Sequence, residues 1–192
     1  MIVIGSPEHE QEVNIRPTNR KLESRHNEAQ FKNGSLFRLS TVEGAIKFAR
    51  ASTGKAGIIA SMRGFHGKTF GALAVTWGSE YKQPFMPMLQ GVTHVPYNNF
   101  LKLKESVNAD TAAVILECVQ GEGGVRVGDK DYFRQVRDLC DSRGILFAID
   151  EVQTGFGRTD TLFAYEQFAE PDLLCVAESL AGGIPMGAVL CS

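Results

Sequence analysis

Three apolar segments of the sequence each end in an acidic residue, and these acids are the first residues that could do chemistry. AVILE ends at Glu117, GILFAID ends at Asp150 and DLLCVAE ends at Glu178. Parallel strands bring their carboxyl ends to one edge of a sheet, where α/β proteins bind ligands. Three carboxylates at that edge could hold Mg²⁺ for phosphoryl chemistry, and this remains one interpretation of the pattern.

The surrounding pattern predicts the elements that would position these acids. Short apolar runs bounded by breakers predict strands, and apolar residues at helical spacing predict helices that alternate with them. Gly144 is expected to stop the last of these helices. The alternation favours an α/β fold with a three-layer, mostly parallel sheet and helices on both faces. The expected strands are 57–61, 92–95, 112–117, 145–149, 173–177 and 187–191, and the expected helices are 41–51, 69 onward, 99–107 and 130–142.

Composition excludes several classes of function. The 192 residues carry a formal charge of −2, so the sequence has no basic surface typical of nucleic-acid binding. No apolar run approaches the roughly 18 residues of a membrane span, and we expect a cytoplasmic protein. The four cysteines lack CxxC spacing and are expected to be free thiols. No G-x-G-x-x-G follows a strand, which argues against a dinucleotide site.

Four pieces of sequence, in order, resemble the class III, fold-type I aminotransferases that use pyridoxal phosphate (PLP). They are VEGAIKFAR from Val42, GFHGKTFGA from Gly64, ECVQGEGG from Glu117 and DEVQTGFGRT from Asp150. The resemblance runs from Val42 to Ser192 and is closest to the acetylornithine, ornithine and carrier-bound lysine aminotransferases. It implies a large PLP-binding domain, and it implies a homodimer for the intact family.

The resemblance also implies roles for particular residues. Asp150 would pair with the pyridine nitrogen of PLP and keep the ring protonated and electron-withdrawing. Phe65 and Val152 would pack on opposite faces of the ring, with His66 beside Phe65 and Gln153 near the phenolic oxygen. Glu117 and Gln120 would support the pocket, and Glu122 would pair with an arginine and gate substrate access.

The sequence departs from the family pattern at two places within the pocket. Glu178 stands where the family has its catalytic lysine, and a carboxylate cannot form a Schiff base. The phosphate-binding turn before Val42 reads LFRLST, which leaves Ser40 and Thr41 as candidate phosphate ligands and Arg38 as a source of charge. An inactive copy or a fragment is therefore one expectation, and a non-catalytic binding or partner protein is the alternative.

The resemblance divides the chain into expected regions. Residues 1–40 are polar and weakly patterned, and we expect a poorly ordered or loosely packed arm there. Residues 41–192 are expected to form a partial large domain without the family's C-terminal small domain. An intact relative would move an amino group between an acetylornithine-, ornithine- or lysine-like donor and 2-oxoglutarate.

Overall fold

The structure is a computed structural model, and it describes residues 41–177, 180 and 186–191. Its centre is a six-stranded sheet with the order β2-β1-β3-β6-β7-β8, in which only β8 runs antiparallel to its neighbour. The strands of this sheet are β1 (Gly57–Ser61), β2 (Val92–Val95), β3 (Thr111–Leu116), β6 (Leu146–Asp150), β7 (Leu173–Val176) and β8 (Ala188–Cys191). The predicted mostly parallel α/β sheet is confirmed.

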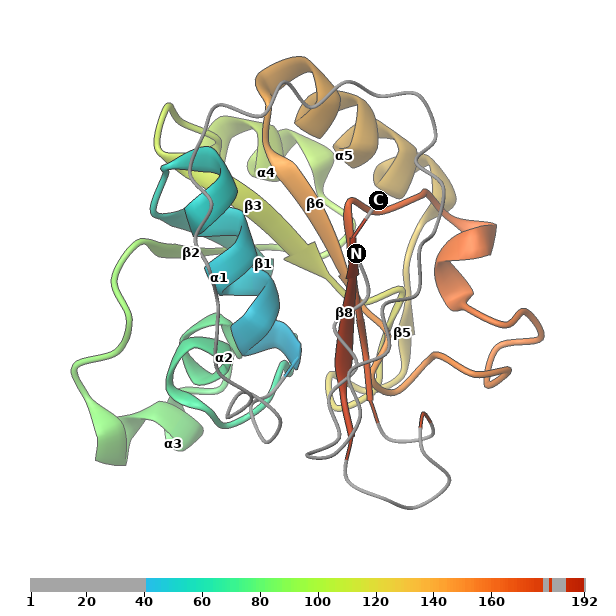
Figure 1. Cartoon of the computed structure of the whole chain (residues 1–192), viewed down its shortest axis with the longest axis horizontal. Coiled ribbons are helices and arrows are strands. Elements are labelled where there is room, and N and C mark those ends of the chain that lie inside the picture. The colour runs from blue at the N-terminus through green and yellow to red at the C-terminus, as the bar shows by residue number, and fades with distance from the viewer. Residues whose placement is uncertain (1–40, 178–179, 181–185, 192) are drawn as a thin grey trace, which may run out of the picture.

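Helices cover both faces of the sheet, as the alternating pattern predicts (Figure 1). Apolar residues of α1 and α2 share one buried cluster with the sheet, and those of α4 and α5 share the other. These helices are α1 (Thr41–Thr53), α2 (Phe70–Val75), α4 (Phe100–Ser106) and α5 (Lys130–Arg143). Further short elements are α3 (Ser79–Lys82), η1 (Gln83–Phe85), η2 (Ala164–Gln167) and a hairpin of β4 (Val119–Gln120) with β5 (Arg126–Val127).

Local sequence explains where helix α5 begins and ends. The Asp129 carboxylate accepts hydrogen bonds from the backbone N–H groups of Asp131 and Tyr132, which satisfies two donors at the helix start. Gly144 ends the helix with a φ of 60°, a conformation that glycine adopts without steric cost. Between these caps, Phe133 and Val136 lie fully buried against the sheet.

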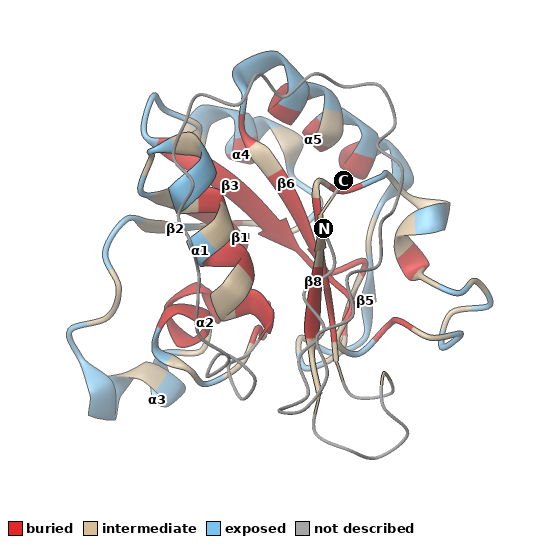
Figure 2. Ribbon diagram, in the orientation of Figure 1, coloured by how far each residue is buried: buried red, intermediate tan, exposed pale blue. Residues whose placement is uncertain are grey.

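Alternation along β6 assigns its side chains to the two faces. Phe147 and Ile149 belong to the α5 cluster, whereas Ala148 belongs to the α1 cluster. Asp150, two residues after Ala148, therefore faces the α1 side of the sheet. Figure 2 shows β3 and β6 coloured mainly as buried.

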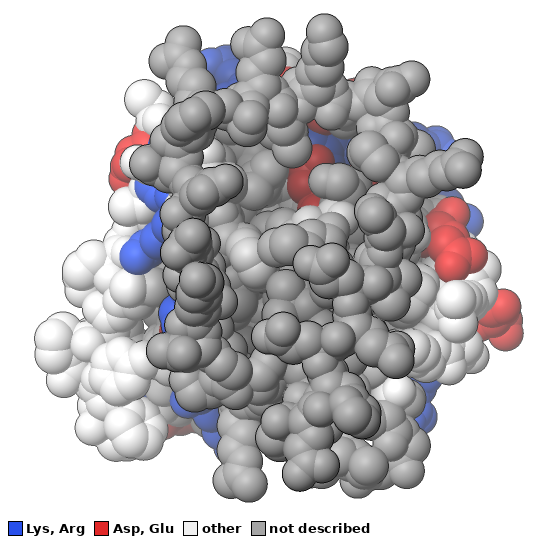
Figure 3. Space-filling model, viewed as in Figure 1, with Lys and Arg blue, Asp and Glu red and all other residues white. Residues whose placement is uncertain are grey.

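The charges of the described residues are mixed rather than gathered. Figure 3 shows Lys and Arg side chains interspersed with Asp and Glu around the part of this face that is not grey. Within the described part of the chain, no helix is long and apolar enough to cross a membrane. The expected arm at residues 1–40 lies outside the described residues.

Candidate functional site

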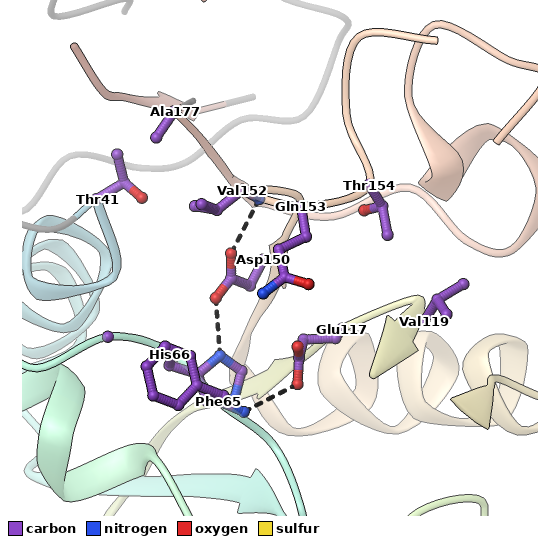
Figure 4. A pocket seen from close by; sticks show the side chains of 11 residues that line it. Thr41, Phe65, His66, Glu117, Val119, Asp150, Val152, Gln153, Thr154 and Ala177 are labelled. Atoms are coloured by element: carbon purple, nitrogen blue, oxygen red, sulfur yellow. Dashed lines mark hydrogen bonds and ion pairs between the residues drawn. The ribbon is translucent and has the colours of Figure 1, made fainter. Parts of the chain in front are cut away.

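A cavity of about 220 Å³ opens at the carboxyl ends of β3, β6 and β7, where the sequence predicted a site. Seven of the predicted or candidate residues line it. They are Thr41, Phe65, His66, Glu117, Asp150, Val152 and Gln153, joined by Gly67, Val119, Thr154 and Ala177 (Figure 4). The cavity therefore brings together segments that lie up to 136 residues apart, from Thr41 to Ala177.

The centre of the cavity is a buried pair formed by His66 and Asp150. His66 Nδ1 lies 2.8 Å from Asp150 Oδ2, and Asp150 Oδ1 accepts a hydrogen bond from the Val152 backbone N–H at 3.1 Å. Burial works to lower the pKa of His66, but the hydrogen bond to Asp150 and the nearby carboxylates raise it above its usual 6.5. A protonated His66 donating Nδ1–H to Asp150 holds this carboxylate in one orientation.

The loop that carries Phe65 and His66 is fixed by the end of α2. Thr76 is fully buried, and its Oγ1 accepts from the His66 backbone N–H at 2.9 Å and donates to the Gly67 carbonyl at 3.1 Å. The Trp77 backbone N–H donates to the Gly64 carbonyl at 2.9 Å. The positions of Phe65 and His66 therefore depend on Thr76 and Trp77, the two residues that follow α2.

Glu117 lies across the cavity from Asp150 and is almost completely buried. Its Oε2 accepts from the Phe65 backbone N–H at 3.2 Å. Burial raises the pKa of the Glu117 carboxyl to about 7, although the positive charge of His66 opposes this shift. Glu117 can therefore hold or release a proton near neutral pH while it supports Phe65.

Val152 and Gln153 are positioned by their neighbour Glu151, which points to the other side of the sheet. Glu151 is fully buried, and Thr154 Oγ1 donates to its carboxylate at 2.8 Å. The backbone N–H groups of Ala164 and Tyr165 donate to the same carboxylate at 2.9 and 2.6 Å. These bonds tie the segment after Asp150 to the start of η2.

The other predicted residues lie outside the inner cavity. Gln120 is fully buried behind it, and its Nε2 donates to Ser61 Oγ at 2.8 Å and to the Met62 carbonyl at 3.0 Å. Glu122 is exposed and lines a neighbouring outer pocket of about 380 Å³. Glu178 lies outside the described residues, as do Arg38 and Ser40.

Sequence reasoning missed Thr76, Glu151 and Glu43 as residues that position the site. The Glu43 carboxylate on α1 accepts from Thr69 Oγ1 at 2.7 Å and from the Gly71 and Ala72 backbone N–H groups at 2.8 and 3.0 Å. Nothing local in the sequence marks these contacts, since Glu43 lies 26 residues before Thr69. The alternation of side chains along β6 was the one usable signal, because it places Glu151 on the opposite face of the sheet from Asp150.

The donor set of the inner cavity fits the ring of PLP. A buried, oriented carboxylate lines one side of the cavity, an aromatic ring lines another, and Val152 supplies an apolar surface. Thr41 begins helix α1 at the cavity wall, where helix N–H groups favour a phosphate. The magnesium interpretation gains no support, because within residues 41–177, 180 and 186–191 no three acidic, histidine or cysteine side chains are placed to hold a metal.

Comparison with known families identifies the chain. Residues 35–192 match the family described as aminotransferase class-III. The chain belongs to this family. It is 51% identical over 150 residues to the acetylornithine aminotransferase of Methanosarcina mazei, and 47% identical over 151 residues to that of Methanopyrus kandleri. These alignments cover 77% and 78% of the chain but only 38% and 39% of the relatives.

A solved structure supports the same conclusion for the fold. The taurine:2-oxoglutarate aminotransferase of Bifidobacterium kashiwanohense, solved in complex with PLP and glutamate, superposes with a TM-score of 0.75 at 30% identity. The match covers 81% of this chain and 42% of that one. The resemblance stated from the sequence is confirmed, and PLP is the cofactor of the class-III family. The chain spans about two fifths of the length of the curated relatives that it matches.

Proposed function

We propose that the chain is the PLP-binding part of a class-III aminotransferase whose intact relatives move an amino group between an acetylornithine-, ornithine- or lysine-like donor and 2-oxoglutarate. The observation that carries the proposal is the His66–Asp150 pair at 2.8 Å in a cavity that Phe65 and Val152 also line. When bound, PLP supplies an electron sink for the α-carbon of the substrate.

The residues of the chain have separate tasks in this proposal. Asp150, oriented by His66 and by the Val152 backbone N–H, would accept a hydrogen bond from the protonated pyridine nitrogen of PLP. Phe65 and Val152 hold the two faces of the ring and exclude water from it. Gln153 would lie near the phenolic oxygen, and its amide packs so closely on Gly121 that a Cβ at this glycine would overlap it. Glu117 and Gln120 support this arrangement.

Glu178 decides whether the chain can turn over substrate. A carboxylate at the lysine position forms no covalent bond to PLP and leaves no amine to move the α-proton of the substrate. We therefore propose that the chain binds PLP weakly and is catalytically inactive. The second candidate, a non-catalytic binding or partner protein, is favoured by this same residue.

Exposed apolar residues support a homodimer. Phe70, Phe85 and Met86 are 58%, 52% and 63% exposed, and all belong to one segment between residues 70 and 86. A second copy of the chain would remove this surface from water, which favours association. Sedimentation equilibrium tests the assignment, since a Phe85→Ser, Met86→Ser variant is expected to weaken the dimer.

The proposed function is tested by PLP binding followed by borohydride reduction and mass spectrometry. The native chain is expected to bind PLP without a covalent adduct, and Asp150→Asn is expected to weaken binding at least tenfold. Glu178→Lys is expected to give one PLP adduct on the new lysine. A covalent adduct in the native chain would contradict the role given to Glu178, and equal binding by Asp150→Asn would contradict the cofactor site.

A further inference from the structure

Strand β3 passes into the β4–β5 hairpin through Glu117 and Cys118, and a tyrosine from another part of the chain holds this junction. Tyr97 follows β2, and its hydroxyl group donates to the Glu117 carbonyl at 2.7 Å and to the Cys118 carbonyl at 3.1 Å. The side chain of Glu117 lines the inner cavity, whereas Tyr97 is not among the residues that line it. Tyr97 therefore holds the backbone of a cavity residue from outside the cavity.

The residue after Tyr97 holds the other end of the hairpin. Asn98 Nδ2 donates to the Val127 carbonyl at 3.2 Å, and Asn98 Oδ1 accepts from the Asp129 backbone N–H at 3.0 Å. The hairpin therefore begins and ends at one anchor, which consists of residues 97 and 98. An anchor at both ends fixes the direction in which the chain leaves β3.

Packing around the Tyr97 hydroxyl group leaves it little freedom. A Cβ on Gly128 would lie 2.8 Å from Tyr97 Oη, so this position requires a glycine. The Tyr97 ring packs edge-to-face on Tyr132 and Phe133, with ring centroids 6.1 and 6.5 Å away. Burial raises the pKa of Tyr97 above its usual 10, and the neighbouring Cys118 and Glu117 add to this shift. The hydroxyl group therefore remains protonated and remains a donor.

The carboxylate of Glu117 continues this chain of contacts to Phe65. Glu117 Oε2 accepts from the Phe65 backbone N–H at 3.2 Å, and the Phe65 side chain lines the cavity (Figure 4). We infer that Tyr97 is a positioning residue of the cofactor site, and that it acts through Glu117 on the wall of the cavity formed by Phe65. The inference rests on the proposed function for the identity of the ligand, whereas the contacts themselves do not depend on it.

Two tyrosines of the same aromatic group provide a matched pair of variants. Tyr97→Phe removes the hydroxyl group that donates to Glu117 and Cys118 and keeps the ring. Tyr132→Phe makes the same chemical change, but Tyr132 Oη has no hydrogen-bond partner among the described residues. An effect found only in Tyr97→Phe therefore belongs to its two hydrogen bonds rather than to the loss of a phenolic oxygen.

Hydrogen exchange in the full chain without PLP measures the effect on Phe65. Tyr97→Phe is expected to speed exchange of the Phe65 amide about tenfold or more relative to amides in the middle of α5, because the acceptor of this amide is released. Tyr132→Phe is expected to leave this ratio unchanged. Uniform acceleration across the chain, or failure of Tyr97→Phe to fold, contradicts the inference, because the hydroxyl group would then serve the whole fold rather than the site.

Carbon-13 NMR titration of the Glu117 carboxyl measures the effect on the residue between them. Burial is the largest cause of its raised pKa of about 7. The other groups that act on it are charged or polar neighbours: His66, Asp150, the Phe65 backbone N–H and Glu122. Water that reaches the carboxyl in Tyr97→Phe is expected to lower its pKa by about one pH unit or more, and Tyr132→Phe is expected to keep it. An unchanged Glu117 pKa in Tyr97→Phe overturns the inference.

PLP affinity connects these contacts to the cofactor site. Tyr97→Phe is expected to weaken PLP binding about tenfold in the native chain and to weaken it no further in a Glu117→Ala background, because the hydroxyl group acts through Glu117. Equal losses in both backgrounds contradict the inference.

The two proposals fail in distinguishable ways. If PLP binding depends on Asp150 while Tyr97→Phe leaves the Phe65 amide and the Glu117 pKa unchanged, the inference about Tyr97 is wrong and the proposed function stands. If PLP does not bind to the native chain, the proposed function is wrong, and the two measurements without PLP still decide whether Tyr97 positions Glu117 and Phe65.

Discussion

Replacement of Thr76 by valine removes the hydroxyl group that fixes the Phe65–His66 loop while it keeps the shape of the side chain. The buried N–H of His66 and the partly buried carbonyl of Gly67 then lose their partner. Leaving a buried polar group unsatisfied costs about 1–3 kcal/mol. Because valine leaves no cavity at this fully buried position and only the His66 N–H is fully buried, we expect a loss of about 1–3 kcal/mol in the free energy of unfolding.

The consequence for the site is a lower pKa for His66. Once the loop shifts, the hydrogen bond to Asp150 weakens, and burial then lowers the pKa of His66 without an equal opposing effect. Urea unfolding measures the first effect, and NMR titration of the His66 ring measures the second. Thr76→Ser retains the hydroxyl and is expected to keep the His66 pKa. Equal His66 titration in the valine variant and the native chain would refute the positioning role of Thr76.

Two further predictions concern the same region. Gly71→Ala places a Cβ 2.7 Å from the Glu43 carboxylate, so this variant is expected to lower the free energy of unfolding by about 1–3 kcal/mol. Alanine normally stabilises a helix relative to glycine, so a variant that is more stable in urea unfolding would contradict the Glu43 contact. The Glu117 carboxyl has its pKa raised to about 7, so between about pH 4.5 and 7 the folded chain retains a proton that the unfolded chain releases. Stability is therefore expected to fall as pH rises through this window, and Glu117→Gln should reduce the slope; an unchanged slope from unfolding at pH 5 and 7.5 would count against it.

The main strands and helices could be predicted because their sequence patterns are local. The strand that ends at Asp150 is an apolar run followed by a polar residue, and the helix before it has a cap at each end. The β4–β5 hairpin could not be predicted, since each strand has two residues and β5 is exposed. A pattern of period two needs more residues than this to be recognised.

The identity of the site residues was predictable, whereas their support was not. Asp150 and His66 were expected at the cofactor, but their direct contact joins residues 84 apart and depends on how the loop after β1 folds over the sheet. The charge of Glu151 predicts an exposed side chain, yet it is fully buried and its carboxylate accepts hydrogen bonds from three donors. Burial of a carboxylate is decided by the donors that the tertiary structure supplies, and these come from residues 154, 164 and 165.

The carboxylate of Glu151 links the segment that lines the cavity to backbone groups on the opposite face of the sheet. Asp150 and Val152 line the cavity on the α1 side of the sheet. On the α5 side, the Ala164 and Tyr165 amides donate hydrogen bonds to Glu151, the residue between Asp150 and Val152. A molecule that binds against Asp150 and Val152 is therefore expected to reduce local opening of this segment and to slow hydrogen exchange at the Ala164 and Tyr165 amides. Amide exchange at Ala164 and Tyr165 would thus report events in a cavity that neither residue lines.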